Sequence, residues 1–539
     1  MSDTEHTLAR GVRTASGLTL VSRLFGLMRD LVTVRVFADT AAGSAFAAAF
    51  AIPNLFRRLF GEGALSAAFL PRYARLLETD EKRAHAYASL VVASLAAITG
   101  VITLALEGGL LAALLAAPDD ADRRLVVGLT MAMLPFMPLI CVAAVLGGML
   151  QTRGRFGPWA AAPIILNLCI IAASAPYFLV EDLFDTPPRA AWGYAIAAAV
   201  VVAGGLQVLW SLRALRGLVS WTRAWSAATG EARSMLIALG PAVLGLGTLQ
   251  LNALLDTLIA IYPNAVGPGL PGWLPLGLAD LAYPLDTASN AVLFYAQRLY
   301  QFPLGVFGIA VATVAFPALS RAAGRPAAFA AALRRALRLS LFIAIPAGVG
   351  LLLVRDDLVR TVYTGAGGFS DAGARDAAAV VAGYAPAVWI FSVNHVLTRA
   401  FYARGDTATP TRAALAAVAL NVALNLTLIW PLAEAGLAAS TSIAAGAQTL
   451  LLSRRLRREL GGPLLDRAAR VSVSRTVTST AVVAGAVAVA SALVGPRAGW
   501  TDAAAGLLAA TTTGAVAHAL VSGAQGAPEL RWLLGRGGR

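Results

Sequence analysis

The chain is short of charged residues, and this shortage excludes several classes of protein. Only 13% of its 539 residues are charged, whereas 58% are hydrophobic, and the mean hydropathy is +0.71. Soluble domains have about 25% charged and about 45–50% apolar residues, so a soluble globular enzyme, a disordered chain and a nucleic-acid-binding protein are excluded. A chain this apolar is expected to cross a membrane repeatedly, because one spanning helix needs about 20 mainly apolar residues.

Residues that serve metal, redox and phosphate chemistry are also scarce. The chain has two cysteines and four histidines. Cys141 and Cys169 lie in apolar runs and match neither a metal-ligand spacing nor a disulfide framework. No glycine-rich loop ending in Lys-Ser/Thr is present to bind ATP. We therefore expect no catalytic residues, and an integral-membrane transferase is disfavoured. The polar start, MSDTEHTLARGVRTASG, also predicts no cleaved signal peptide.

Long apolar segments follow one another along the whole chain. They predict an all-α integral membrane protein with about 14 transmembrane helices. Their approximate ranges are 16–38, 44–70, 86–116, 125–150, 158–180, 190–212, 234–261, 288–318, 337–354, 377–402, 413–431, 435–453, 474–495 and 502–523. The longest outside connection, 262–287, is rich in glycine and proline, and we expect it to lie on the membrane surface or to cover the mouth of a cavity.

The basic residues predict the orientation of these segments. The chain has 43 lysines and arginines, and Lys82 is the only lysine among them. If the N-terminus is cytoplasmic, thirty of them fall in the loops and termini on the inside and only seven in the outside loops, which are acidic instead. Positively charged loops mark the cytoplasmic side. We therefore expect both termini in the cytoplasm and assign the basic loop 454–475 mainly to topology, with lipid binding as the alternative.

Six arginines remain, all within or at the edge of apolar segments. A charge at membrane depth costs about 2.5–3.5 kcal/mol on insertion scales, so such residues usually face a cavity or a partner. Pro53 and two glycines interrupt the second segment, and Pro303 and two glycines interrupt the eighth. Broken helices at this depth line protein or a water-filled cavity. The six residues are Arg23, Arg29, Arg35, Arg57, Arg58 and Arg298.

The sharpest hypothesis is that four of these arginines line one central cavity. A guanidinium is always charged and its planar fork suits phosphate oxygens. Arg23, Arg29, Arg57 and Arg298 would then form a strongly positive pocket for an anion such as a pyrophosphate, with Arg58 beside it. The alternative is that each arginine reaches the membrane interface or pairs with an acid. Asp30 and Glu62 could neutralise two of them.

A second polar set lies in later segments. Asp256 falls in the seventh segment, and Asn421 and Asn425 share one face of the eleventh. Thr441 lies in the twelfth. One carboxylate and several neutral oxygens could hold a small hard cation, although such side chains more often hydrogen-bond across a helix interface.

Five stretches spread along the chain form a recognisable pattern. They are SRLFGLMRD at 22–30, AFAIPNLFRRLFGEGALSAAFLPRYARLL at 49–77, QTRGRFGPWAAAPIILN at 151–167, FYAQRLYQFPLGVFGIAVATVAFPALSR at 294–321 and FYARGDTATPTR at 401–412. With these stretches the sequence resembles the MviN/MurJ family of lipid II flippases over almost its whole length. Their order, their spacing and the count of segments all agree with the family.

The resemblance implies the fold of the multidrug/oligosaccharidyl-lipid/polysaccharide exporters. Two lobes of six helices, at 1–220 and 221–460, would surround a central cavity. The last two helices, at 461–539, would form a groove for a lipid tail. Its implied activity is to flip undecaprenyl-pyrophosphate-linked peptidoglycan precursor, lipid II, from the inner to the outer leaflet of the plasma (inner) membrane by alternating access, for cell-wall synthesis.

The resemblance also carries residue roles. The essential cavity arginines of the family match Arg23, Arg29, Arg57 and Arg298, and its proposed sodium site matches Asp256, Asn421, Asn425 and Thr441. The expected partners are lipid II and membrane lipids, with no nucleic acid, and the expected state is a monomer with no cofactor other than a coupling sodium ion. Three positions depart from the family pattern, since acids are replaced there by Ser44, Gln297 and Gln301.

Two other transport functions stay open at this point. An exporter of another polyprenyl-linked glycan would use the same pocket. A drug or cation antiporter on the same fold is disfavoured, because a cationic substrate would need an acidic cavity in the N-terminal lobe.

Overall fold

The computed structural model shows a chain built of helices. It describes residues 21–61, 64–116, 120–155, 157–180, 188–270, 281–365, 367–494 and 499–533. Within these ranges there is no β-strand, and the single isolated β-bridge joins Gly269 and Ala282. The all-α prediction is therefore confirmed for the described part of the chain. Glu62 and residues 271–280 of the predicted long connection lie outside it.

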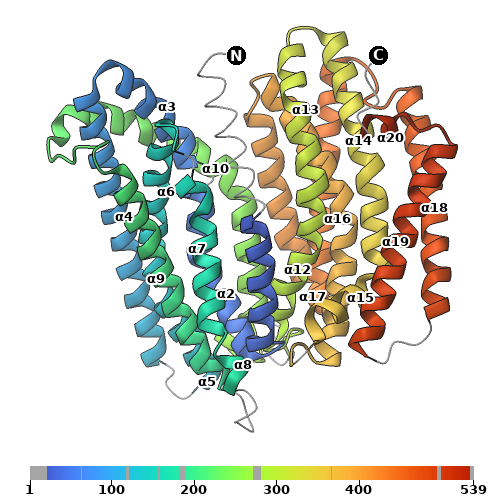
Figure 1. The fold of residues 1–539 in the computed structure, drawn as a ribbon, viewed down its shortest axis with the longest axis horizontal. Coiled ribbons are helices and arrows are strands. Elements are labelled where there is room, and N and C mark those ends of the chain that lie inside the picture. Colours follow the sequence, from blue (N-terminus) through green and yellow to red (C-terminus); the bar gives the residue numbers. More distant parts are fainter. Residues whose placement is uncertain are drawn as a thin grey trace. The chain divides into compact units, whose positions relative to one another are not determined.

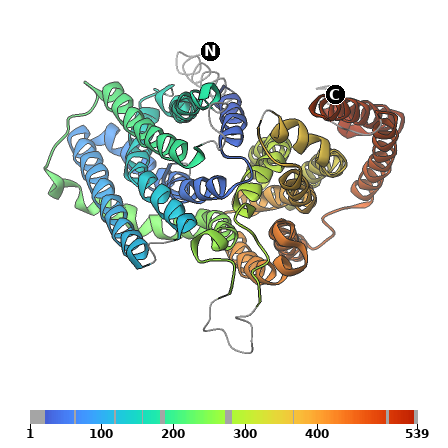
Figure 2. The same ribbon diagram turned by 90° about the horizontal axis from the view of Figure 1, so that it is seen from below.

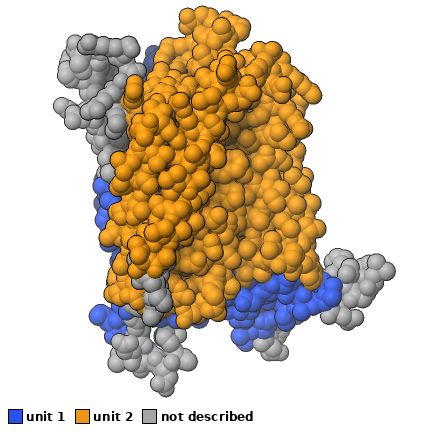
Figure 3. All heavy atoms as spheres, turned by 90° about the vertical axis from the view of Figure 1, so that its right-hand side faces the viewer, with its two compact units in different colours: residues 1–291 blue, residues 292–539 orange. Residues whose placement is uncertain are grey.

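The helices form two compact units, Met1–Ala291 and Val292–Arg539 (Figures 1 and 3). The described part of unit 1 begins with a helix over residues 21–37. It continues with α2 (Ala41–Phe56), η1 (Arg57–Gly61), α3 (Ala64–Thr79), α4 (Glu81–Ala116), α5 (Ala121–Met133), α6 (Phe136–Thr152), α7 (Gly157–Ser174), α8 (Tyr177–Val180), α9 (Arg189–Leu215), η3 (Trp225–Ala228), α10 (Thr229–Ala260) and α11 (Tyr262–Ala265). The lobe boundaries implied by the family resemblance stay predictions.

Unit 2 holds the remaining helices, and α12 crosses the boundary between the units. These helices are α12 (Ser289–Pro303), η5 (Leu304–Gly308), α13 (Ile309–Ala322), α14 (Pro326–Leu353), α15 (Arg355–Val359), η6 (Arg360–Thr364), α16 (Asp371–Ala403), α17 (Ala408–Leu460), α18 (Arg467–Val494), α19 (Trp500–Ala524) and α20 (Pro528–Leu533). Within this unit, α16 packs against α13, α14 and α17, while α18 packs against α14 and α19 (Figure 2).

Ten helices in the described ranges are long and apolar enough to cross a membrane. The prediction was fourteen segments. The helix over 21–37, the helices from Ala41 to Thr79 and α10 coincide with three further predicted segments but are not among the ten. One of the ten, α17, covers two predicted segments. The count of fourteen stays a prediction.

Helix α17 is two antiparallel helices joined by a tight turn. Its backbone leaves the helical region at Ala433, where φ is 46° and ψ is −130°, two residues after Pro431. Asn421 and Thr441 are 20 residues apart, which is about 30 Å along a straight helix. Asn421 Nδ2 nevertheless donates to Thr441 Oγ1 at 3.3 Å. The chain therefore folds back at this turn, as the separate predicted segments 413–431 and 435–453 require.

A glycine allows the two halves of α17 to meet. A Cβ atom at Gly436 would collide with the carbonyl oxygen of Leu428 on the other side of the turn. The absence of a side chain lets backbone approach backbone there, as small residues do between membrane helices. Proline, glycine and the strained Ala433 thus build the turn from local sequence.

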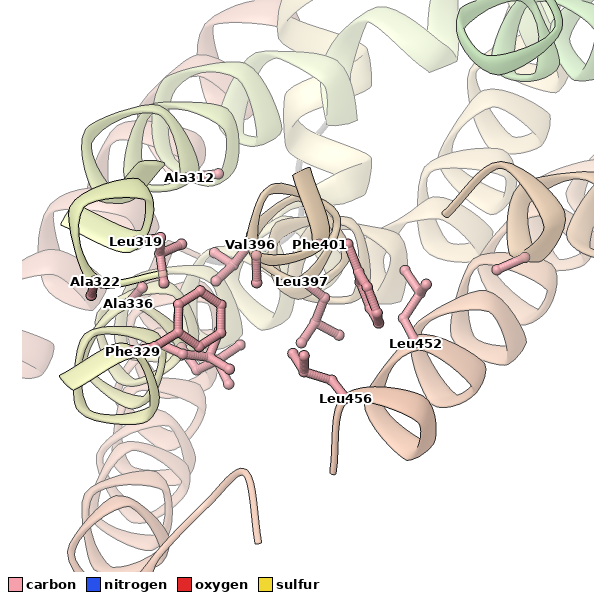
Figure 4. Close-up of a cluster of buried hydrophobic side chains, with 14 residues drawn as sticks. Ala312, Leu319, Ala322, Phe329, Ala336, Val396, Leu397, Phe401, Leu452 and Leu456 are labelled. Carbon is pink, nitrogen blue, oxygen red and sulfur yellow. The ribbon is translucent and has the colours of Figure 1, made fainter. Parts of the chain in front are cut away.

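The core of unit 2 near one end of its helices is a cluster of aliphatic and aromatic side chains (Figure 4). Phe329 and Leu333 come from α14, Leu397 and Phe401 from α16, and Leu452 from the second half of α17. All five are at most 1% exposed. Their burial fixes α14, α16 and α17 against one another, and α18 then packs on α14.

We predict that Gly436→Ala destabilises the protein, because the added methyl group must push Leu428 away. Overpacking of this kind costs about 1–3 kcal/mol of unfolding free energy. Thermal unfolding of the purified protein in detergent measures the effect. The matched control is Gly446→Ala in the same helix, where the nearest atom, Ile390 Cδ1, would lie 3.9 Å from the new Cβ. Equal midpoints for the two variants would contradict the close approach.

Candidate functional site

Unit 1 contains a cavity of about 410 Å³. Its walls come from the helix over 21–37, from α2, α6, α7 and α9, and from the start of η1. Phe50, Ile140 and Leu166 supply part of the apolar lining. The polar lining includes Arg29, Asn54, Arg57, Asn167, Gln207 and Ser211, with no acidic residue among the lining side chains.

Arg29 is held in place at the edge of this cavity by three neighbours. Its Nη2 lies 2.6 Å from Asp30 Oδ1 and its Nη1 donates to Asn167 Oδ1 at 3.2 Å. Its guanidinium carbon lies 5.9 Å from the ring centre of Phe50, in cation–π contact. The Arg29 and Asp30 side chains are only 15% and 12% exposed. Asp30 therefore pairs with Arg29, in agreement with the alternative that individual arginines are neutralised by a nearby acid.

Asn167 connects two helices through this contact. It lies within the apolar run of α7, where a polar residue is costly unless it is hydrogen-bonded. Its Oδ1 accepts from Arg29, and its Nδ2 donates to the carbonyl oxygen of Ser22 at 3.3 Å. The side chain thus fixes α7 against the helix over 21–37 and orients Arg29.

Arg57 enters the same cavity from a broken helix. Helix α2 contains Pro53, and the backbone then changes to a π-helix over Arg57–Gly61. The interruption predicted from Pro53 is therefore present, and such π-helical turns are frequent at functional sites. Arg57 Nε donates to Asn54 Oδ1 at 3.0 Å. Its neighbour Arg58 is not a lining residue, and its Nη1 donates to Gln250 Oε1 at 3.1 Å.

Two other arginines of the first helix lie elsewhere. Arg23 is exposed and is not among the residues that line the cavity. The guanidinium carbon of Arg35 lies 4.6 Å from the ring centre of Phe178. The structure thus brings Arg29 and Arg57 to one cavity, while Arg23 and Arg35 occupy other surroundings.

Arg298 belongs to unit 2, on α12. It is half-buried, and its guanidinium carbon lies 4.6 Å from the ring centre of Phe294. Pro303 ends α12 and a second π-helix, η5, follows it, as the predicted interruption requires. Gln297, which departs from the family pattern, donates through Nε2 to the hydroxyl of Tyr384 at 3.0 Å. The gathering of Arg298 with the unit 1 arginines stays a prediction.

The predicted cation ligands are divided between the two units. Asn421, Asn425 and Thr441 form a buried network in unit 2, in which Asn425 Nδ2 donates to Asn421 Oδ1 at 2.9 Å and Asn421 Nδ2 donates to Thr441 Oγ1. Asp256 lies in unit 1, 2% exposed, and accepts at 3.4 Å from Asn252. The three unit 2 side chains supply neutral oxygens of the kind a hard cation binds. No group of three or more His, Cys, Asp or Glu suited to a metal occurs in the described ranges.

Sequence reasoning missed several residues of the unit 1 cavity. Asn54, Asn167, Gln207 and Ser211 were not singled out, although Asn167 and Gln207 each interrupt an apolar run. An intramembrane polar residue is itself a signal. Trp159 also lines the cavity, and nothing in its sequence position distinguishes it from an interfacial tryptophan.

The fold is that of a known class of membrane transporters. A solved structure entitled "Lipid II flippase MurJ, inward closed conformation" matches with a TM-score of 0.74 at 20% identity, over 94% of this chain and 98% of that chain. An inward-facing multidrug resistance MATE family transporter of the MOP superfamily matches with a TM-score of 0.61 at 13% identity, over 83% and 98%. The chain has the fold of these transporters.

Sequence comparison identifies the family. The family model described as lipid II flippase MurJ matches residues 33–501. A probable lipid II flippase MurJ of Rhizobium tropici is 33% identical over 451 residues, 81% of this chain and 79% of the relative. Its counterpart in Rhizobium meliloti (strain 1021) is 31% identical over 491 residues, which are 88% of this chain and 86% of the relative. The chain belongs to the MurJ family of lipid II flippases, and the expected resemblance is confirmed. It is a multi-pass membrane transporter and not an enzyme.

We predict that water reaches the unit 1 cavity while the chain is in the membrane. In a variant with Cys141→Ala and Cys169→Ala, a cysteine replacing Ala162 on the cavity wall should react with a membrane-impermeant maleimide added to inverted and right-side-out vesicles. The control is Leu168→Cys on the same helix, which is 45% exposed but does not line the cavity. Lipid should shield it, so equal labelling of both cysteines would contradict a hydrated cavity.

Proposed function

We propose that this chain flips lipid II, the undecaprenyl-pyrophosphate-linked peptidoglycan precursor, from the cytoplasmic to the outer leaflet for cell-wall synthesis. Membership of the MurJ family supports the substrate, since the curated relatives carry the name lipid II flippase. The observation in the structure that supports it most is the cavity that Arg29 and Arg57 share.

The chemistry of this cavity suits a lipid-linked pyrophosphate. Two guanidinium groups at membrane depth, with no acid among the lining residues, favour an anion. The cavity has a volume of about 410 Å³, and in this proposal it takes the pyrophosphate and the sugar next to it. Asn54, Asn167, Gln207 and Ser211 offer neutral hydrogen-bonding groups for the hydroxyl and amide groups of a sugar.

The proposed mechanism is alternating access. The headgroup enters from the cytoplasmic leaflet and binds Arg29 and Arg57 through its phosphates, while the prenyl tail stays in lipid. The lobes then rock and release the headgroup outside. An inside-negative potential favours outward movement of negative charge by about 2.3 kcal/mol per charge per 100 mV, so the potential alone can drive the cycle.

The orientation belongs to this proposal. Thirty basic residues against seven support a topology with both termini in the cytoplasm. The family places the chain in the inner membrane of bacteria. We propose that it works as a monomer, because the cavity that carries the arginines is built within one unit of one chain.

Sodium coupling is a further part of the proposal. Asn421, Asn425 and Thr441, all in unit 2, would hold the ion through their side-chain oxygens. Binding and release of sodium would couple flipping to the sodium gradient, as a second driving force besides the membrane potential.

An antiporter for cationic drugs, although it shares the fold, is not favoured. Such a substrate needs acidic side chains in the cavity. Asp30 is the acid nearest to the lining arginines in sequence, and it already pairs with Arg29.

We predict that Arg29→Ala and Arg57→Ala each abolish complementation of a flippase-depleted strain, because each removes a phosphate donor from the cavity. Arg29→Lys keeps the charge but loses the planar fork, so we expect partial complementation. The matched control is Arg75→Ala, which changes an exposed arginine of α3 outside the cavity.

Membrane abundance, measured by immunoblot, must be the same for all of these variants. Wild-type growth of the Arg29→Ala strain at normal abundance would refute the assignment of the cavity. Loss of growth in the Arg75→Ala strain would point to a general effect of charge instead.

We predict that Asn425→Ala removes any stimulation of flipping by sodium while leaving flipping driven by the potential intact. Proteoliposomes that hold fluorescent lipid II, with sodium or potassium outside and a fixed diffusion potential, measure both components. Wild-type protein that flips equally in sodium and potassium would argue against the sodium site.

A further inference from the structure

A second cavity, of about 450 Å³, lies in unit 2 where α18 begins. It is separate from the arginine cavity of unit 1 and shares no lining residue with it. Three helices form its walls, and no acidic side chain is among its lining residues. Those that matter here are Arg338 from α14, Arg467, Val471, Ser472 and Arg475 from α18, and Pro528 from α20.

One wall of this cavity is fixed by a buried ion pair. Arg338 Nη2 lies 2.6 Å from Glu529 Oε1, and Glu529 is only 1% exposed. The hydroxyl of Ser472 donates to the same carboxylate oxygen at 2.7 Å. The contact holds α14, α18 and α20 together. Glu529 neutralises the charge of Arg338 within the protein.

The other two arginines carry charge that this pair does not neutralise. Arg467 and Arg475 are exposed, and no ion pair joins either of them to an acid in the described ranges. They are eight residues apart on α18, so they lie about 12 Å apart along the axis and about 80° apart around it. Val471 is four residues from each and lies midway between them. The cavity therefore presents two guanidinium groups and an apolar surface together.

An exposed apolar stripe continues from the cavity along α18. Val471, Val482 and Val489 are 43%, 46% and 62% exposed. They are spaced by eleven and seven residues, close to three and two turns of helix, so they share one face. Beside the cavity, Trp532 of α20 stacks under Arg335 and Arg338, whose guanidinium carbons lie 4.6 and 5.0 Å from the ring centre. Tryptophan is enriched at the level of lipid headgroups.

This arrangement fits one occupant better than others. The C-terminal residues 534–539, LGRGGR, contain two arginines and no aspartate or glutamate, so a cavity lined by arginines does not favour their side chains. A soluble anion would use the arginines but not the valine stripe. A lipid with a phosphate headgroup uses both, and basic pockets between membrane helices bind such headgroups.

We propose that this cavity binds the phosphodiester headgroup of an anionic glycerophospholipid, with Arg467 and Arg475 donating to the phosphate. One acyl chain then lies along Val471, Val482 and Val489. By the topology proposed above, the lipid comes from the cytoplasmic leaflet. The site does not depend on lipid II as the transported substrate.

Native mass spectrometry of the full-length protein released from detergent tests the proposal. The probes are phosphatidylglycerol and phosphatidylcholine with identical acyl chains. Wild-type protein should retain phosphatidylglycerol in preference. The double variant Arg467→Gln/Arg475→Gln should bind it about thirtyfold more weakly, as expected for two lost contacts near the membrane surface. Its weak binding of phosphatidylcholine should not change.

A matched variant removes the same charge outside the cavity. Arg457 and Arg458 are exposed at the end of α17 and do not line the cavity. Arg457→Gln/Arg458→Gln should keep wild-type affinity for phosphatidylglycerol. An equal loss in both double variants, or none in the first, overturns the proposal.

Two competitors separate the lipid from other sources of phosphate. Glycerol 3-phosphate should fail to displace phosphatidylglycerol, since it lacks the acyl chain, and displacement at equal concentration would indicate a soluble anion. Undecaprenyl pyrophosphate should not compete at this site, and competition that the double variant abolishes would reassign the cavity to the transported substrate. A flipping assay with lipid II reports separately on the proposed function.

Discussion

The structure depends on how it accommodates a permanent positive charge within apolar helices. A guanidinium does not lose its proton under physiological conditions. A buried lysine can become neutral through a shift of its pKa, but a buried arginine cannot. Arg29 must therefore be solvated by the protein. Asp30 supplies charge, Asn167 supplies a neutral acceptor and Phe50 supplies a ring face. These three contacts come from three helices, so placing one charge also fixes the packing of the helix over 21–37, α2 and α7.

The other arginines show that position along the chain does not determine surroundings. Arg35 lies over Phe178, Arg58 donates to Gln250, and Arg23 is exposed. Burial cost applies equally to all of them at the level of sequence. What separates Arg29 and Arg57 is that both line one cavity. Arg57 is the first residue of the π-helix that follows α2, four residues after Pro53.

Hydropathy and charge patterns predicted the helical fold well, because every spanning segment must satisfy its own backbone hydrogen bonds. They also separated the two halves of α17, as the apolar segments 413–431 and 435–453. Asn167 escaped prediction because its value lies in two contacts, with Arg29 and with Ser22, that join α7 to the first described helix. Such pairings depend on tertiary packing, and a single sequence does not show which distant residues come into contact. Arg298 was singled out by the same burial cost as Arg29, and the helix interruption after Pro303 was predicted with it, whereas its cation–π contact with Phe294 was not.

The two arginine-lined cavities share one design and differ in a way that suits two tasks. Each contains one arginine bound to an acid at 2.6 Å, Arg29 with Asp30 and Arg338 with Glu529. In both units the paired arginine itself lines the cavity. In the proposed transport cycle, a phosphate that enters the unit 1 cavity must compete with Asp30 for the guanidinium of Arg29. Competition lowers affinity, and a transporter needs this because a substrate held too tightly is not released. In unit 2 the acid is 1% exposed and also accepts from Ser472. Glu529 fixes the wall of the cavity, while Arg467 and Arg475 keep their positive charge for a ligand. In the proposal, this arrangement favours retention of a lipid over its release.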